Sequence, residues 1–195
     1  MKKLLITGFE PFGGESLNPS WEAVKRLPDT IGDYSLTKLS LPVVFGKAAT
    51  ALIGAADSIH PDVILSIGQA GGRSGITPEL VGINLRHATI PDNEGNEPKD
   101  EPITVGGASA YFSTLPLRAM VSAITEIGLP SQVSYSAGAY VCNDVIYTLL
   151  SHLDGTSTHF GFIHVPYSPE QEKEPNMSID DVTRGLIAAI ESIDG

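Results

Sequence analysis

Residues 62–72 read DVILSIGQAGG, an apolar run that stops abruptly at a glycine-rich turn. A short, continuous apolar run bounded by turn residues is typical of a strand that is buried on both faces of a sheet. Such strands belong to parallel sheets, whose helical crossovers cover both faces. Ligands of these sheets gather beyond the carboxyl ends of the strands. The turn that starts at Gly68 therefore marks the edge where we expect a functional site.

The segments on either side of this strand alternate between strand-like and helix-like patterns. We expect further strands at 3–7, 35–43, 81–86, 133–137 and 159–165, and helices at 19–26, 45–59, 114–127, 141–152 and 179–193. Asn18 followed by Pro19 suits a helix start, and Ser178 opens a capping-box pattern. Residues 91–102 hold five acidic residues and three prolines, which indicates a solvated loop. The alternation predicts an α/β fold with a mostly parallel sheet covered on both faces.

Composition and charge exclude several classes of protein. The 195 residues are 42% hydrophobic and 18% charged, which suits one globular domain over residues 1–195 rather than a disordered or fibrous chain. Twelve basic against 23 acidic residues give a net charge of −11, which argues against nucleic-acid or anionic-membrane partners. No apolar run approaches the roughly 20 residues that span a bilayer, and the first residues do not resemble a signal peptide. We therefore expect a soluble, cytoplasmic protein.

Cys142 is the only cysteine, so an intrachain disulfide or a cysteine-rich metal site is impossible. It follows an expected strand and a glycine-containing turn, and it stands where a helix should begin. A helix N-terminus presents free N–H groups and a partial positive charge, both of which stabilise a thiolate. The position suits a nucleophile with a pKa below the ordinary thiol value of about 8.5. The alternative is a small, inert, buried side chain.

A cysteine nucleophile needs a base, and the chain holds five histidines. His60 and His152 stand at expected helix ends, where a cation interacts well with the helix dipole, so we interpret them as structural. His159 begins its strand, away from the carboxyl ends, and His87 stays an open alternative. His164 ends the same strand as His159, where ligands gather, and is the best candidate. Its alternative role is that of a buried structural histidine.

A third group should orient the imidazole, and an ionised carboxylate is suited to this task. Glu79 follows the glycine-rich turn and can reach the same sheet edge, but spacing alone does not select it. Residues 8–14 are also rich in glycine, yet they lack the ending of a phosphate loop and the dinucleotide spacing. Residues 69–73 could bind an anion. The acidic loop at 92–101 has no histidine and little rigidity, so we do not expect a metal site there.

Several blocks of the sequence resemble the pyroglutamyl peptidase I (pyrrolidone-carboxylate peptidase) family. They are TGFEPFGG (7–14), NPSWEAV (18–24), GQAGGR (68–73), IPDNEG (90–95), SAGAYVCN (136–143) and GFIHVPY (161–167). The blocks occur in the family's order and span nearly the whole chain. The resemblance implies a cysteine peptidase that removes N-terminal pyroglutamate from peptides, without a cofactor or metal. It also implies a three-layer α/β/α sandwich, phosphorylase/hydrolase-like, and a homo-oligomer, often a tetramer.

The resemblance implies a role for particular residues. The nucleophile falls on Cys142, the base on His164 and the orienting acid on Glu79. The pocket for the neutral lactam ring falls on six residues: Phe9, Phe12, Asn18, Gln69, Tyr140 and Val141. Aromatic faces suit the flat ring, and a few polar groups suit its amide. An ordinary N-terminus would bury an ammonium group in such a pocket, which is costly.

Some residues depart from the family pattern and leave alternatives open. Thr89 stands where many members have arginine, so that arginine's task is unfilled or passes to Arg73 or Arg86. Tyr140 replaces a common phenylalanine, and Asp144 replaces a common histidine. A phosphorylase-like glycosyl transferase would need a phosphate site, for which the turn ending at Arg73 is the only hint. A binding protein that has lost turnover is a third possibility, which Thr89 keeps open.

Overall fold

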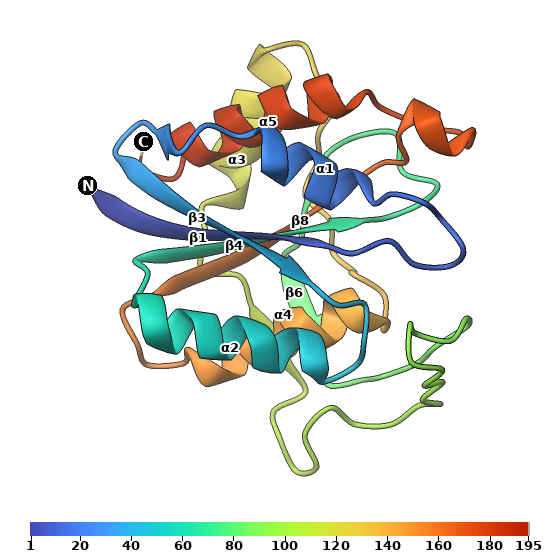
Figure 1. Ribbon diagram of the computed structural model, residues 1–195. Coiled ribbons are helices and arrows are strands. Elements are labelled where there is room, and N and C mark those ends of the chain that lie inside the picture. Colours follow the sequence, from blue (N-terminus) through green and yellow to red (C-terminus); the bar gives the residue numbers. More distant parts are fainter. Residues whose placement is uncertain (195) are drawn as a thin grey trace.

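The computed structural model describes residues 1–194 and has three layers, with a twisted sheet between two layers of helices (Figure 1). In spatial order the sheet consists of β2 (Thr30–Ile31), β3 (Tyr34–Leu41), β1 (Lys2–Phe9), β4 (Val63–Gln69), β8 (His159–Val165) and β5 (Thr77–Pro78). The four central strands are parallel, and the short edge strands β2 and β5 are antiparallel to their neighbours. This arrangement confirms the predicted mostly parallel sheet.

The helices divide between the two faces of the sheet. Figure 1 shows α1 (Pro19–Arg26), α3 (Leu117–Glu126) and α5 (Ile179–Glu191) above the sheet, and α2 (Lys47–Ile59) and α4 (Val141–His152) below it. The α/β/α sandwich is thus confirmed. A short 3-10 helix, η1 (Pro169–Gln171), follows β8, and β6 (Val81–Ile83) pairs with β7 (Ala110–Phe112) in a separate two-stranded sheet. No helix within residues 1–194 has the length and apolar character needed to cross a membrane.

Most predicted elements are present, but one strand is wrong and another is shorter than expected. Residues 133–137 form no strand; this segment runs beside the β5 edge and contributes only single bridges, such as that of Ser134 to Glu79. It bends into the turn at Gly138, whose φ of 77° favours glycine, and this turn leads into α4. β6 covers only the first half of the predicted 81–86 strand and lies outside the main sheet.

The start of α1 fixes where the chain goes after β1. Asn18 caps the helix as predicted, and its Oδ1 accepts from the backbone N–H of Ser20 (3.1 Å). The Ser20 hydroxyl in turn accepts from the N–H of Phe9 (3.0 Å). A Cβ at Gly8 would lie 2.6 Å from the Trp21 Cα, so only glycine lets β1 pass this close to the helix. The loop after β1 is thereby held at the carboxyl edge of the sheet.

Two hydrophobic cores lie on opposite faces of the sheet, and they determine which way each strand residue faces. Phe160 and Phe162 of β8 belong to the core under α2 and α4, whereas Ile163 and Val165 belong to the core under α1, α3 and α5. Alternate residues of a strand share a face. His164 therefore lies on the same face as α4, the helix that carries Cys142.

Candidate active site

The carboxyl ends of β4 and β8 lie side by side, and they bring the predicted nucleophile and base to one edge. Gly68 pairs with His164 across the two strands, and paired positions face the same side of a sheet. A Cβ at Gly68 would lie 3.0 Å from Cys142 Sγ and 2.7 Å from the Phe162 ring. Because glycine leaves this space free, the sulfur can approach the strands next to His164.

The third predicted residue also reaches this edge. β5 pairs antiparallel with the end of β8, so that Thr77 lies opposite His164 and Glu79 follows directly. His164 Nδ1 and Glu79 Oε1 are 2.6 Å apart, and both side chains are buried. Burial acts to raise the pKa of Glu79, but the hydrogen bond with His164 and the positive charge of Arg73 outweigh it and hold this pKa below its ordinary value. Glu79 is therefore ionised at neutral pH.

The protonation of the imidazole follows from this contact. An ionised carboxylate only accepts hydrogen bonds, so the proton of a neutral His164 is on Nδ1, and the lone pair of Nε2 is free. Burial lowers the pKa of His164, although the hydrogen bond to Glu79 opposes this shift. At neutral pH the side chain is thus a neutral imidazole that can accept a proton at Nε2.

Cys142 lies in the first turn of α4, as predicted, but its predicted low pKa is wrong. Burial raises the pKa of the thiol to about 12, and the negative charge of Glu79 adds to the effect. The positive charge of Arg73 and the backbone N–H of Cys142 oppose the rise without cancelling it. Within residues 1–194 no hydrogen bond joins Cys142 to His164. The resting site therefore holds a neutral thiol near a neutral base, and the thiol proton has to leave as the sulfur attacks.

The N-terminus of α4 supplies hydrogen-bond donors beside the sulfur. Tyr140 is the N-cap residue, and no side chain caps the helix. The first helical hydrogen bond runs from the N–H of Asp144 to the carbonyl of Tyr140 (3.1 Å). The preceding N–H groups, at residues 141–143, have no helical acceptor and can stabilise an oxyanion that forms next to Cys142.

Aromatic side chains surround this helix end. Phe12 and Phe45 both lie against Tyr140, with ring centroids 6.2 and 5.2 Å away, and Phe9 lies 6.2 Å from Phe162. The Tyr140 hydroxyl donates to the Pro91 carbonyl (3.0 Å), which ties this wall to the acidic loop. Val141, Phe9 and the other predicted aromatic residues share the core under α2 and α4. Phe45 was not among the predicted pocket residues, because it was expected to be the first residue of the 45–59 helix, whereas it lies in the turn before α2.

The two predicted amide residues have protein partners of their own. Asn18 Nδ2 donates to the Glu10 carbonyl (3.0 Å), in addition to the capping contacts of its oxygen. Gln69 Oε1 accepts from Gln171 Nε2 (3.0 Å), on the far side of β4 from Cys142. Within the described residues no contact brings either amide to Cys142, His164 or Glu79. Through these contacts, Asn18 holds the loop that follows β1 in place.

Arg73 and Arg86, the two candidates to replace a missing arginine, have different partners. Arg73 Nη1 lies 2.6 Å from Glu79 Oε1, inside the site. Arg86 Nε lies 2.6 Å from the buried carboxylate of Asp144, and the other oxygen of Asp144 accepts from the Gly46 N–H (2.7 Å). Arg86 is thus committed to the unusual Asp144. Because Glu79 engages Arg73, the glycine-rich turn does not present a free arginine to a phosphate.

The other histidines lie away from this site. His87 pairs with Asp100 on the surface, and His152 pairs with Asp57 across α4 and α2. His159 lines a cavity of about 470 Å³ together with ten other residues, one of which is Lys2.

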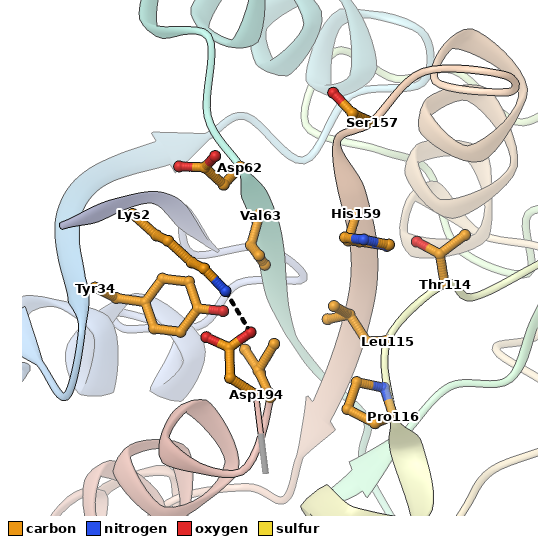
Figure 2. A pocket seen from close by; sticks show the side chains of 11 residues that line it. Lys2, Tyr34, Asp62, Val63, Thr114, Leu115, Pro116, Ser157, His159 and Asp194 are labelled. Atoms are coloured by element: carbon orange, nitrogen blue, oxygen red, sulfur yellow. Dashed lines mark hydrogen bonds and ion pairs between the residues drawn. The ribbon is translucent and has the colours of Figure 1, made fainter.

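 Lys2, Val63 and His159, which all line this cavity, are the first residues of β1, β4 and β8 (Figure 2). The cavity is therefore at the amino end of the sheet, and His159 lies away from the carboxyl edge, as predicted.

Comparisons with known proteins find a matching family model, similar sequences and similar solved structures. A family model described as pyroglutamyl peptidase matches residues 2–194. A pyrrolidone-carboxylate peptidase of Streptococcus pyogenes serotype M3 (strain SSI-1) is 51% identical over 197 residues, which cover 98% of this chain and 92% of the relative. The crystal structure of Bacillus amyloliquefaciens pyroglutamyl peptidase I is similar, with a TM-score of 0.95, 46% identity, and coverage of 99% of this chain and 97% of that chain. Pyrrolidone carboxyl peptidase from Thermococcus litoralis has a TM-score of 0.94 and 37% identity, with coverage of 100% and 94%.

Proposed function

The chain belongs to the pyroglutamyl peptidase family and is a cysteine peptidase that removes N-terminal pyroglutamate from peptides, and we propose that it does so with Cys142, His164 and Glu79 through a thioester. One observation carries the proposal. The 2.6 Å contact between His164 Nδ1 and Glu79 Oε1 leaves Nε2 free, on the face of the sheet where Cys142 lies in the first turn of α4. This is the arrangement that activates a thiol by an oriented base.

The first half of the reaction forms the thioester. Cys142 Sγ attacks the carbonyl carbon that joins pyroglutamate to the next residue, and the thiol proton moves to His164 Nε2. Glu79 stabilises the imidazolium, while the N–H groups at 141–143 bind the oxyanion. The carbon–nitrogen bond then breaks, and Nε2 gives its proton to the leaving amine. The product of this half is a peptide with a free N-terminus.

The second half regenerates the enzyme. Water attacks the thioester carbonyl and gives a proton to Nε2, so that the same base serves again. The carbon–sulfur bond breaks, pyroglutamate leaves, and the sulfur regains its proton from the imidazolium. No group other than water is consumed, in agreement with a hydrolase.

The substrate ring belongs in the aromatic wall next to the sulfur. We place the lactam among Phe9, Phe12, Tyr140 and Val141, because these side chains lie on the Cys142 face and suit a flat, neutral ring. Asn18 and Gln69, named by the family resemblance, are proposed to supply amide hydrogen bonds. Asn18 Nδ2 uses one of its two N–H groups for the Glu10 carbonyl, and Gln69 accepts through Oε1, so each amide has an N–H left to offer.

Alkylation of the single thiol tests the proposed state of the site. Iodoacetamide should add one label per chain and abolish activity. Because the pKa of Cys142 is about 12, the labelling rate should rise about tenfold for each pH unit from neutral pH toward 10. Intact mass and residual activity are measured in the same samples. The lactam 2-pyrrolidone should slow the labelling, because it fills the pocket beside the sulfur.

The unfolded chain is the control for this measurement. Its thiol has an ordinary pKa, so its labelling rate should level off above about pH 8.5, and the lactam should have no effect. A rate in the folded enzyme that levels off below this pH would contradict the neutral resting thiol. Full activity after one label per chain would remove Cys142 from the mechanism.

We also infer a homo-oligomer, a tetramer by family resemblance, in the cytoplasm. An apolar groove of about 330 Å³ supports the association, since Leu80, Leu115 and Val133 line it and the exposed Tyr135 borders it. Exposed apolar surface of this kind is typical of an interaction site. A single cysteine fits a reducing compartment.

A further inference from the structure

Arg73 is the one charged group of the site that the mechanism above leaves without a task. It lies in the turn after β4, and its guanidinium makes three hydrogen bonds. Nη1 donates to Glu79 Oε1 (2.6 Å) and Thr77 Oγ1 (2.5 Å), and Nη2 donates to the Ser136 carbonyl (3.0 Å). We propose that Arg73 is a positioning residue, which holds Glu79 Oε1 between its own guanidinium and the His164 imidazole. This inference rests on the proposed triad.

The geometry requires an anchor for Glu79. The same oxygen, Oε1, meets both Arg73 and His164, while Oε2 is buried and has no hydrogen-bond partner within residues 1–194. The nearby Ser134 hydroxyl donates instead to the Ser136 carbonyl (3.1 Å). Because Oε2 contributes no hydrogen bond, the orientation of the carboxylate depends on the two contacts of Oε1. Without Arg73, the only contact that holds the Glu79 carboxylate would come from His164, which is the side chain that Glu79 orients.

The guanidinium also joins the segments that carry the triad. Thr77 and Glu79 belong to β5 and the residues after it, next to the end of β8. Ser136 lies in the segment that leads into α4 and Cys142. A planar arginine fork can bond all three acceptors at once, whereas a lysine ammonium is a point charge on a flexible stem. Arg73 therefore holds the segment that carries Glu79 against the segment that leads to Cys142.

The charge of Arg73 also affects the base. The charged groups that act on His164 are Glu79 and Arg73, and Cys142 and Tyr140 are the other titratable groups of the site. Burial lowers the pKa of His164, Glu79 raises it, and Arg73 lowers it. Burial is the main reason why the imidazole stays neutral with a carboxylate 2.6 Å away, and the charge of Arg73 adds to this effect. Removing its charge should raise the pKa of His164.

The chain offers a matched control in a second arginine–carboxylate pair. Arg86 and Asp144 are also 2.6 Å apart. The exposed fractions agree: 26% and 0% for Arg86 and Asp144, against 25% and 0% for Arg73 and Glu79. Breaking either pair leaves a buried carboxylate without its arginine, which destabilises a fold. Only the loss of Arg73 should change the titration of His164.

The test compares Arg73→Met, Arg73→Lys and Arg86→Met with the parent protein. The pKa of His164 is measured by NMR titration in a Cys142→Ala background, with the resonance assigned from its loss in His164→Gln. Arg73→Met should raise this pKa, whereas Arg73→Lys and Arg86→Met should leave it near the parent value. With Cys142 present, Arg73→Met should lower kcat by about 10- to 100-fold, as loss of an orienting outer contact does elsewhere. The acid limb of its kcat/KM profile should move to higher pH.

Each result supports or overturns the proposal. An unchanged His164 pKa in folded Arg73→Met, or equal shifts in Arg73→Met and Arg86→Met, would overturn it, as would a rise in KM with kcat unchanged. Should Arg73→Met not fold, Arg73→Lys decides the question, because lysine keeps the positive charge but lacks the planar guanidinium. The kcat of Arg73→Lys should then fall, while the acid limb of its kcat/KM profile stays at the parent pH. An unchanged kcat in this variant would refute the positioning role. Failure of the triad itself would appear separately, as measurable turnover by Cys142→Ala. The NMR titration does not measure turnover, so its result is independent of that outcome.

Discussion

Replacing Cys142 by alanine should lower kcat for a pyroglutamyl amide by about a millionfold, because members of a catalytic triad act as a unit. Cys142 is the only thiol of the chain, so no other sulfur can take over the attack. Alanine is smaller than cysteine and a better helix former, so it fits the first turn of α4 without a clash. The fold and the thermal unfolding midpoint should change little. Release of a chromophoric amine is followed over hours to reach the residual rate.

Cys142→Ser is the matched control for this loss. It keeps nearly the same shape and offers a hydroxyl to the same base, but a hydroxyl is a far weaker nucleophile at neutral pH than a thiol. Its turnover should therefore also be very low, while binding of 2-pyrrolidone should persist in both variants. A folded Cys142→Ala enzyme that keeps most of its turnover would refute the nucleophile.

Peptides that begin with proline should be cleaved at least about 10⁴-fold less efficiently, in kcat/KM, than those that begin with pyroglutamate. The two rings have similar size, but proline carries a secondary ammonium and lacks the ring carbonyl. A site built to hydrogen-bond a group rejects the analogue that lacks it, since its own polar atoms are left unpaired. The charged nitrogen adds the cost of burial against Phe12 and Tyr140.

Tyr140→Phe separates the ring of Tyr140 from its hydroxyl in this test. The hydroxyl contacts the Pro91 carbonyl, so its loss should affect the attachment of the acidic loop more than the choice of substrate. Discrimination between prolyl and pyroglutamyl amides should therefore survive in Tyr140→Phe. Comparable kcat/KM values for the two amides in the parent enzyme would contradict the lactam pocket.

The central strands and the helices could be predicted because burial produces regular patterns. The apolar run at 62–67 became β4, and the helix start at Asn18 followed from its capping chemistry. Residues 133–137 also carry a strand-like pattern, but they bond only at single points along β5. β5 itself has two residues, too few for any pattern. Edge pairing of this kind depends on the finished sheet rather than on local sequence.

The candidate site residues that lie directly at the ends of the sheet strands were easier to predict than those that reach the site through other segments. Cys142 and His164 follow from the rule that ligands gather at carboxyl ends. Glu79 does not, because it reaches the site through β5, and only the family resemblance selected it. The role of Arg73 depends on contacts among three segments, which no motif encodes. The thiol pKa was predicted in the wrong direction because the packing that desolvates the partly buried Cys142 is a tertiary property.

Trapping the thioester tests the central claim most directly. A pyroglutamyl aryl ester has a good leaving group, so acylation should outpace hydrolysis and the acyl-enzyme should accumulate. Acid quenching during turnover, followed by mass spectrometry of the intact chain and its peptides, should show one pyroglutamyl group per chain, attached to Cys142. Turnover of the ester with Cys142 unmodified at every quench time, or with the group on another residue, would contradict the mechanism.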